Sequence, residues 1–443
     1  MSASPPAGLL AQEEPPAASP EFEAPLLALD EAVSLALGNN RSVKNSALEA
    51  QKSDELVAIA RSRRFPHFHF DVLAGSLLQP FDFTFPAGSF GSYPGVGPIP
   101  GTDAKITTPA QFTTFATAAL DQPLTQLHKI NLGVRLNELG REIAREELRA
   151  TRQKVTAEVR SAYFDLVAAQ TALEATREAW TALNEVQRVT AEHEGQQAVL
   201  RADALEVDAR LAKSKYELSA AENRLATQQE RINDLLGRDL TTRFRVEPIP
   251  EQDASSFTLD SARQRALENR PEIRQADLRE RQAESDRRLA KAEYIPDLSF
   301  SVRYLGFNNF EVLPRNVETA GLYLSWEPFD WGRRRHRVAE KSQAVDQARI
   351  GAQQTLSQVS LEVGMKYRRW SEAELLVPAA RTEYEAAKEQ LRVMADRYRE
   401  EAALLKDLLQ SQTRTTQAEF QYQQALSTYW GAMADLRRAM GEE

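Results

Sequence analysis

The chain has 443 residues, of which 27% are charged and 42% are hydrophobic, and its formal net charge is -9 at pH 7. This composition is typical of long solvent-exposed helices, and the negative charge argues against a nucleic-acid partner because no basic patch stands out to neutralise phosphates. The sequence contains no cysteine, which excludes a disulfide framework, a thiolate zinc site, a cysteine nucleophile and an acylated N-terminal cysteine on this chain.

The N-terminal residues 1–27 are rich in Pro, Ala, Ser and Glu, and we predict that they form a disordered tail. They lack the basic start and the apolar run of a signal peptide, so we interpret the chain as a mature or trimmed form from which the signal peptide is missing. The sequence has no run of about 18 apolar residues, and we therefore expect no transmembrane helix.

The rest of the chain is an internal duplication. We assign a first repeat to residues 28–245, a linker with Pro248 and Pro250 to residues 246–256, and a second repeat to residues 257–441. The segments that match between the repeats are 29–32 with 259–262, 65–70 with 295–300, 122–124 with 327–329, and 236–237 with 440–441. Each repeat therefore reads as a helix, a strand, a loop, a second strand and two long helices.

The period of the apolar residues places these elements along the chain. In the first repeat we expect strands at about 65–85 and 111–123 and long helices at about 128–190 and 198–236. In the second repeat we expect strands at about 296–310 and 318–328 and long helices at about 334–396 and 404–440. The Gly/Pro-rich segment 86–109 lacks the Lys-Thr pair and the helix start of a phosphate-binding loop, so we expect a surface loop there.

The long helices carry apolar residues at every seventh position, as in the series Val159, Leu166, Leu173 and Trp180. A sustained repeat of this kind indicates helices that pack side by side with a left-handed supercoil. A helix of roughly 60 residues is about 90 Å long, so it needs neighbours along its whole length. Taken alone, these helices favour the alternative function, a soluble coiled-coil scaffold or interaction protein with no pore.

The strands favour a membrane protein instead. Apolar and polar residues alternate in the segments 297–304 and 318–327, which gives each strand one apolar and one polar face. The flanking helices are already paired, so nothing evident covers the apolar face. A tilted strand of about 10 residues crosses a bilayer. Four strands cannot close a barrel with a usable lumen, and several copies of the chain would have to share one.

Catalytic motifs are missing from the sequence, which has no HExxH, nucleophile-elbow, P-loop or dinucleotide-binding pattern. His67 and His69 share a strand face and could offer two metal ligands, but no third ligand is evident nearby. Carboxylates are spread along helix surfaces, so no acid–base pair can be nominated. We therefore predict that the protein is not an enzyme and holds no metal or other cofactor.

Over nearly its full length the chain resembles the TolC-type outer-membrane efflux family. The matching features are the starts Leu29–Asn39 and Leu259–Asn269, Pro66 and Pro296 before strands, Pro123 and Pro328 after strands, and a glycine near the end of each repeat. The resemblance implies a mainly α fold with a small β part, in which a homotrimer forms a twelve-stranded outer-membrane β-barrel continued by an α-helical periplasmic tunnel. It also implies a passive exit duct of a tripartite efflux pump or type I secretion system, which exports small molecules, metals or proteins. The implied partners are outer-membrane lipid, a periplasmic adaptor protein and an inner-membrane pump.

Members of this family close the periplasmic end of the tunnel with Tyr, Arg and Asp side chains near the turns between long helices. Tyr398, Asp203 and Asp407 match such positions, which implies a Tyr398–Asp203 latch and a threefold ring of Asp407 that attracts cations. The helix turns that would dock the adaptor contain Gly195, Arg399, Glu400 and Glu401.

These turns also depart from the family pattern. Glu401 replaces the turn glycine of the second repeat, and Gly195 lies two residues farther from its aspartate than usual. Ala403 and Gln410 occupy the positions of an arginine and of a second aspartate in the best-known member. An alternative interpretation of the charged residues at these turns is that they are solvated helix ends with no further role.

Overall fold

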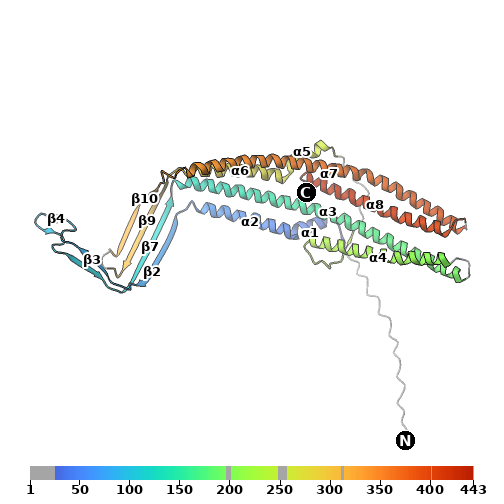
Figure 1. Ribbon diagram of the computed structural model, residues 1–443, viewed down its shortest axis with the longest axis horizontal. Helices are drawn as coiled ribbons and strands as arrows, with labels where there is room; N and C mark the ends of the chain where they lie inside the picture. Colours follow the sequence, from blue (N-terminus) through green and yellow to red (C-terminus); the bar gives the residue numbers. More distant parts are fainter. Residues whose placement is uncertain (1–24, 196–200, 248–256, 311–313, 401, 443) are drawn as a thin grey trace, which may run out of the picture. The chain divides into compact units, whose positions relative to one another are not determined.

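The computed structural model describes residues 25–195, 201–247, 257–310, 314–400 and 402–442. The chain is mainly helical with a small β part, as predicted (Figure 1). The helices are α1 (Leu29–Asn39), α2 (Arg41–Ser62), α3 (Gln126–Gly195), α4 (Arg201–Leu235), α5 (Leu259–Asn269), α6 (Pro271–Ala292), α7 (Arg333–Arg399) and α8 (Leu405–Ala439). The strands are β1 (Leu26–Leu27), β2 (His67–Ser76), β3 (Phe81–Phe85), β4 (Ser92–Tyr93), β5 (Gly97–Pro98), β6 (Ala104–Thr108), β7 (Phe112–Pro123), β8 (Arg245–Val246), β9 (Asp297–Asn308) and β10 (Asn316–Ser325).

The fold divides into two compact units. The sheet unit lies within residues 37–157, 255–374 and 432–443, and the coil unit lies within residues 1–36, 158–254 and 375–431. The predicted tail at 1–27 lies outside the described residues up to position 24, and the predicted linker at 246–256 lies outside them from position 248 onward. None of the described helices combines the length and the apolar character that a bilayer span requires.

Two helices, where we expected one, precede the first strand of each repeat in the structure. The break between α1 and α2 lies at Asn40, whose side chain accepts hydrogen bonds from the backbone N–H groups of Ser42 at 2.8 Å and Val43 at 3.4 Å. In the second repeat the break lies before Pro271, which takes the first position of α6. Asparagine at the N-cap and proline at the first helical position are both start signals, and the sequence interpretation did not use them.

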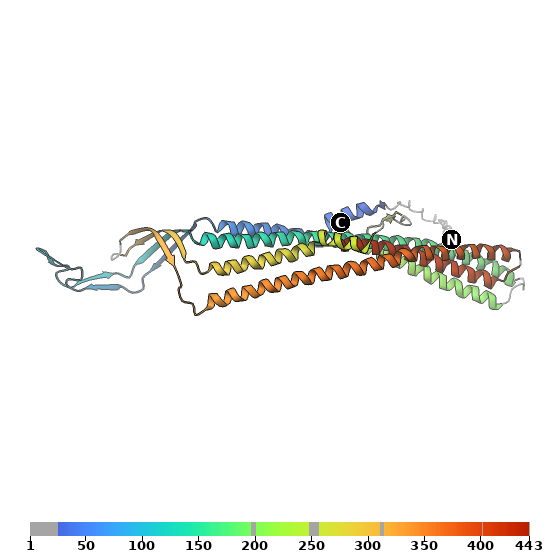
Figure 2. The ribbon, with the colours of Figure 1, turned by 90° about the horizontal axis from the view of Figure 1, so that it is seen from above.

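A four-stranded antiparallel sheet forms the centre of the sheet unit, in the order β10-β9-β7-β2. In both views α2 runs beside α3, and α6 runs beside α7 (Figures 1 and 2). Ion pairs link the helices of each pair, with Arg61 to Glu138 at 2.6 Å across the first and Lys341 to Asp286 at 3.0 Å across the second. The sheet strands are therefore continuous with paired amphipathic helices.

The segment 65–85, which we expected to be one strand, forms two. β2 joins the four-stranded sheet, whereas β3 pairs with β6 in a separate hairpin. The segment 86–109, which we expected to be a plain loop, contains the short pair β4 and β5 and also β6, the second strand of this hairpin. Apolar residues alternate again at Phe81, Phe83 and Phe85, but at odd-numbered positions, whereas Phe68 and Phe70 of β2 stand at even-numbered positions. This change of phase marks where the chain leaves the sheet, and the sequence interpretation did not use it.

The coil unit is packed around the predicted heptad positions. Val159, Leu166 and Leu173 of α3 are buried, which confirms their place in a helix–helix seam. Phe164 of α3 stacks on Trp430 of α8 with ring centroids 5.3 Å apart. Aromatic contacts of this kind add to the stability that burial of the rings supplies, so they hold α8 against α3.

Candidate channel surfaces and helix turns

One face of the four-stranded sheet is apolar and exposed. The register places Phe70 opposite Ala118, and Ala118 opposite Tyr304. Phe68 precedes Phe70 by two residues in β2 and therefore projects from the same face. Phe68 is 71% exposed and lies at the edge of this apolar face, on the outer strand β2. A contiguous apolar surface of this kind marks a contact with another protein or with a membrane.

The opposite face of the sheet is polar near the helices. His67 of β2 lies opposite Asp121 of β7, and Asp121 lies opposite Ser301 of β9. A hollow of about 370 Å³ opens beside these residues and is lined by Arg63, His67, Asp121, Pro123, Gln126, Ile130 and Ser299. Within the described part of the chain, no three His, Asp or Glu side chains gather as metal ligands. His67 is exposed and lines this hollow on the polar face.

The outer edges of β2 and β10 have no partner strand within the described chain. Each of these edge strands has 10 residues, so each presents a row of free backbone N–H and C=O groups. A long edge of this kind invites pairing with another chain. Because all neighbours in the sheet are antiparallel and the sheet has an even number of strands, β10 of one copy can meet β2 of the next in an antiparallel pair.

The turn between α7 and α8 contains most of the predicted gate and docking residues. Tyr398 and Arg399 lie in the last turn of α7, Glu400 directly follows it, and Asp407 lies in the first turn of α8. Asp407 and Arg399 are both exposed. A cation in the last turn of a helix and an anion in the first turn both complement the helix dipole, so local stability alone explains these charges.

A chain of ion pairs stabilises the end of α7. Arg399 pairs with Asp396 at 3.1 Å, Asp396 pairs with Arg392 at 3.3 Å, and Arg392 pairs with Glu389 at 2.6 Å. After the helix, the backbone N–H of Ala402 donates to the carbonyl oxygen of Arg397 at 2.8 Å. Arg399, a predicted docking residue, therefore has its ion-pair partner on α7 itself.

The remaining predicted site residues are less completely described. Gly195 is the last residue of α3, and Asp203 lies in the first turn of α4. The side chain of Asp203 and the whole of Glu401 lie outside the described residues. The Tyr398–Asp203 latch, the Asp407 ring and the adaptor-docking role of these turns all stay predictions.

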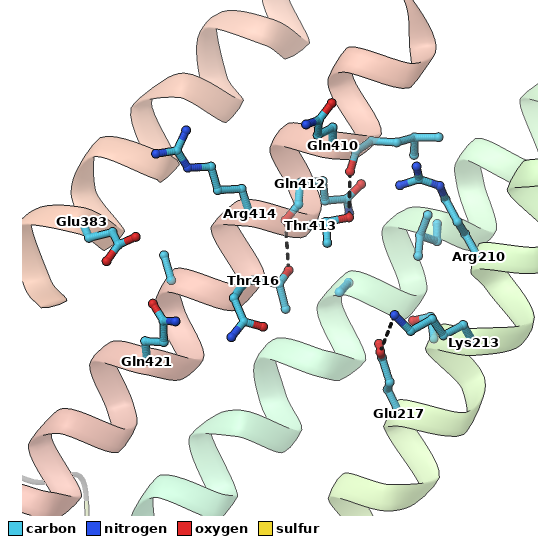
Figure 3. A pocket seen from close by; sticks show the side chains of 16 residues that line it. Arg210, Lys213, Glu217, Glu383, Gln410, Gln412, Thr413, Arg414, Thr416 and Gln421 are labelled. Carbon is cyan, nitrogen blue, oxygen red and sulfur yellow. Dashed lines mark hydrogen bonds and ion pairs between the residues drawn. The ribbon is translucent and has the colours of Figure 1, made fainter.

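A groove in the coil unit was missed in the sequence interpretation (Figure 3). Its larger part has a volume of about 770 Å³, with α4 contributing Arg210, Lys213 and Glu217 and α8 contributing Thr413 and Gln417. Ala179 and Leu183 of α3 form part of the wall between them. A second part of about 300 Å³ shares Glu217, Thr416 and Gln417 with the first and continues along α3 past Ala169, Ala172 and Thr176.

The signal for this groove was present in the sequence. Ala169, Ala172, Thr176 and Ala179 are three or four residues apart, so they form one stripe along α3. Small side chains on a helix let a neighbouring helix approach closely or leave a hollow between flanking helices. The sequence does not distinguish these two outcomes, because the heptad pattern shows which residues share a face but not what covers that face.

A half-buried carboxylate borders the smaller part of the groove. Burial raises the pKa of Glu419 of α8 above its ordinary value, and the negative charge of Glu178 adds to the rise, whereas a hydrogen bond with Tyr384 and the charge of Lys388 oppose it. Burial and the neighbouring Glu419 also raise the pKa of Tyr384. The Tyr384 ring stacks on Tyr422 with centroids 6.1 Å apart. This cluster places an ionisable pair inside the packing of the coil unit.

The fold is that of solved outer-membrane channels. The chain is similar to the channel OprN, with 20% identity and a TM-score of 0.75 over 94% of this chain and 90% of that chain. CmeC of Campylobacter jejuni is 18% identical, with a TM-score of 0.73 over 93% of this chain and 85% of that one. The open state of MtrE of Neisseria gonorrhoeae is 16% identical, with a TM-score of 0.71 over 94% of this chain and 89% of that one.

The family is shown by a match that covers both repeats. The model of the outer membrane efflux protein family matches residues 32–238 and 262–442. A comparison with curated protein sequences gave no match. The family consists of transport proteins, in agreement with the prediction that the chain is not an enzyme. The resemblance inferred from the repeated motifs is thereby confirmed: the chain belongs to the outer membrane efflux protein family and is an outer-membrane efflux channel.

Proposed function

We propose that three copies of the chain join their sheets edge to edge into one outer-membrane β-barrel and act as the passive exit duct of a tripartite efflux pump. The observation that carries this proposal is an exposed apolar face on a four-stranded sheet whose two edge strands are unpaired within the described chain. Lipid would cover the apolar face, and neighbouring copies would pair the edges. Three such sheets supply twelve strands, enough for a barrel with an open lumen rather than one filled by side chains.

The polar face of the sheet would then line the lumen. His67, Asp121 and Ser301 meet across three strands on that face and would contact water and cargo. Transport through such a passive duct would be driven by an inner-membrane pump. The match to an efflux family favours small molecules or metal ions over secreted proteins as the cargo.

A periplasmic adaptor would link the duct to that pump through the coil unit. The groove between α4 and α8 is lined by Gln, Thr and charged side chains, which would suit an amphipathic helix with a polar contact face. The turns at Gly195, Arg399, Glu400 and Glu401 would contact the end of the same adaptor. Tyr398 and Asp203 would latch these turns in the closed state, and Asp407 would form a ring of three carboxylates.

Disulfide trapping tests the shared barrel directly, because the chain contains no cysteine that could interfere. Val72→Cys on β2 is combined in turn with cysteine at Glu318, Ala320 or Leu322 on β10, and the membrane-inserted protein is oxidised. We expect at least one pair to give covalent dimers and trimers on denaturing gels, whereas each single variant gives at most dimers.

A matched control pairs Val72→Cys with cysteine at Phe300 of the inner strand β9, which should not cross-link copies. If every pair leaves the protein monomeric although it is in the membrane, the shared barrel is wrong. A protein that stays in solution as a monomer or dimer without detergent would instead support the coiled-coil scaffold.

A further inference from the structure

The connection between β10 and α7 holds three exposed aromatic side chains, those of Trp326, Phe329 and Trp331. Trp326 continues the two-residue spacing of Leu322 and Leu324, so it extends the apolar face of the sheet toward the helices. Phe329 is 85% exposed, and Trp331 is completely exposed. Indole rings are suited to the boundary between the apolar and polar parts of a bilayer, because one end is apolar and the N–H needs a polar partner.

The turn that carries Trp331 has a defined conformation that hydrogen bonds stabilise. Trp331 has a φ of 56°, a left-handed conformation that is uncommon for a bulky residue, and Gly332 follows with a φ of 86°. The Asp330 carboxylate accepts hydrogen bonds from the backbone N–H groups of Gly332 at 3.1 Å and of Arg334 at 3.0 Å. The fold therefore holds a tryptophan outward in a strained turn, where no described side chain covers it.

A run of basic residues follows Trp331 directly along the chain. Residues 326–337 contain four arginines and two carboxylates, a formal net charge of +2, within a chain whose net charge is -9. Glu327 pairs with Arg333 at 2.5 Å and with Arg334 at 3.2 Å, and Glu293 pairs with Arg337 at 3.3 Å. Arg335 is exposed, and no hydrogen bond or ion pair of its side chain is found among the described residues.

A second basic run lies at the opposite edge of the sheet. Arg63 and Arg64 connect α2 to β2 and precede Phe65, which is also exposed. At the inner crossing from β7 to α3, by contrast, the cation Lys129 is already paired with Asp297 at 2.6 Å. Where the sheet joins its helices, Arg63, Arg64 and Arg335 have no side-chain partner among the described residues, and they lie next to the two edge strands. When β10 of one copy meets β2 of the next, these two basic runs come together.

We propose that this junction binds the anionic headgroup of a phospholipid in the periplasmic leaflet of the outer membrane. The site consists of residues 326–337 of one copy and residues 63–65 of the neighbouring copy, and it rests on the proposed shared barrel. Phe329 and Trp331 lie at the level where the acyl chains begin, and Arg335 and Arg64 hold the headgroup phosphate. Guanidinium groups suit phosphate because they donate two parallel hydrogen bonds.

Native mass spectrometry of the purified full-length protein tests the site. The protein is incubated in detergent micelles that contain either phosphatidylglycerol or phosphatidylcholine, and the lipids retained by the trimer are counted. We expect the wild type to retain phosphatidylglycerol preferentially. Arg335→Gln should lower this preference about 5-fold, the effect of removing one basic residue from an anionic lipid surface. Trp331→Ala should lower the retention of both lipids, because the indole contacts the part that they share.

The matched control is Arg369→Gln, which removes the same charge from another exposed position of α7. Arg335→Lys keeps the positive charge and should therefore retain part of the preference for phosphatidylglycerol. Equal retention of the two lipids by the wild type, or an equal loss in Arg369→Gln and Arg335→Gln, would overturn the lipid site. In either case normal channel conductance would leave the proposed duct intact, whereas absent conductance would overturn the duct itself.

Discussion

Phe300 of β9 lies directly opposite Leu322 of β10, and both side chains project from the same face of the sheet. Leu322 is 67% exposed, and Phe300 is exposed as well. A cross-strand pair of large apolar side chains stabilises a sheet when something covers it. No described residue of this chain covers the pair, so a substitution at either position tests directly whether the face contacts lipid.

The first prediction concerns the cost of a charge on that face. Leu322→Arg should destabilise the membrane-inserted protein by about 2–4 kcal/mol, because the guanidinium would lie in hydrocarbon near the middle of the bilayer. Thr319→Arg introduces the same side chain on the opposite face of the same strand and should have a much smaller effect. Unfolding by denaturant in lipid vesicles gives both free energies. Equal costs for the two variants would count against lipid on the apolar face.

The second prediction concerns how the chain segments 25–28 and 244–247 are held in the coil unit. The hydroxyl of Tyr163, which is only 3% exposed, donates to the carbonyl oxygen of Leu27 at 2.9 Å and accepts from the N–H of Glu247 at 3.1 Å. Tyr163→Phe leaves both backbone groups without this partner and should lower the free energy of unfolding by about 1–3 kcal/mol.

The control for that variant is Tyr216→Phe, which removes the same hydroxyl from an exposed ring and should change the free energy of unfolding by less than about 0.5 kcal/mol. Thermal or denaturant unfolding followed by helical circular dichroism measures both. A Tyr163→Phe protein as stable as the wild type would show that water replaces the two hydrogen bonds without loss.

The third prediction concerns pH. Because the pKa of Glu419 is raised in the folded chain, the folded state binds a proton more tightly than the unfolded state does. The stability that this proton supplies is present below the ordinary pKa of 4.5 and is lost as the pH rises through the raised pKa. The coil unit should therefore be more stable at mildly acidic than at neutral pH.

Glu419→Gln should flatten that part of the pH profile, since glutamine stays neutral. Glu400→Gln, at an exposed position after α7, should leave the profile unchanged. Melting temperatures measured across the mildly acidic range would decide the matter. A wild-type melting temperature that increases steadily with pH over this range would contradict the assignment to Glu419.

The fourth prediction concerns the helix turns. If Asp407 forms a ring of three carboxylates around the periplasmic entrance, Asp407→Ala should weaken the block of current by multivalent cations, because the focused negative potential is lost. Glu400→Ala removes a neighbouring carboxylate and should have a smaller effect. Titration of the cation during bilayer recording gives the block constants. Unchanged block in Asp407→Ala would remove this residue from the gate.

The sequence predicted the fold class, the family and the apolar face, because the two-residue alternation in 297–304 and the heptads of α3 depend only on residue order. It did not predict where β2 ends and β3 begins, because the shift of the apolar residues from even positions in β2 to odd positions from Phe81 onward was not interpreted as a break. It also missed the groove along Ala172 and Ala179, because a stripe of small residues is compatible with either close helix contact or an open hollow. Predicted gate residues such as Tyr398 could be proposed only through the family resemblance, because such roles would depend on neighbouring copies.

A water-filled duct across the outer membrane should conduct ions, and single-channel recording measures that conduction. Purified trimers added to a planar lipid bilayer should give discrete current steps. Disulfides formed between β2 of one copy and β10 of the next should leave these steps intact, because these strands would already be paired in the barrel. The contrary result would be trimers that insert into the bilayer yet pass no current at any voltage. If the Tyr398→Phe variant, in which the proposed latch is weakened, also passes no current, the chain does not form such a duct.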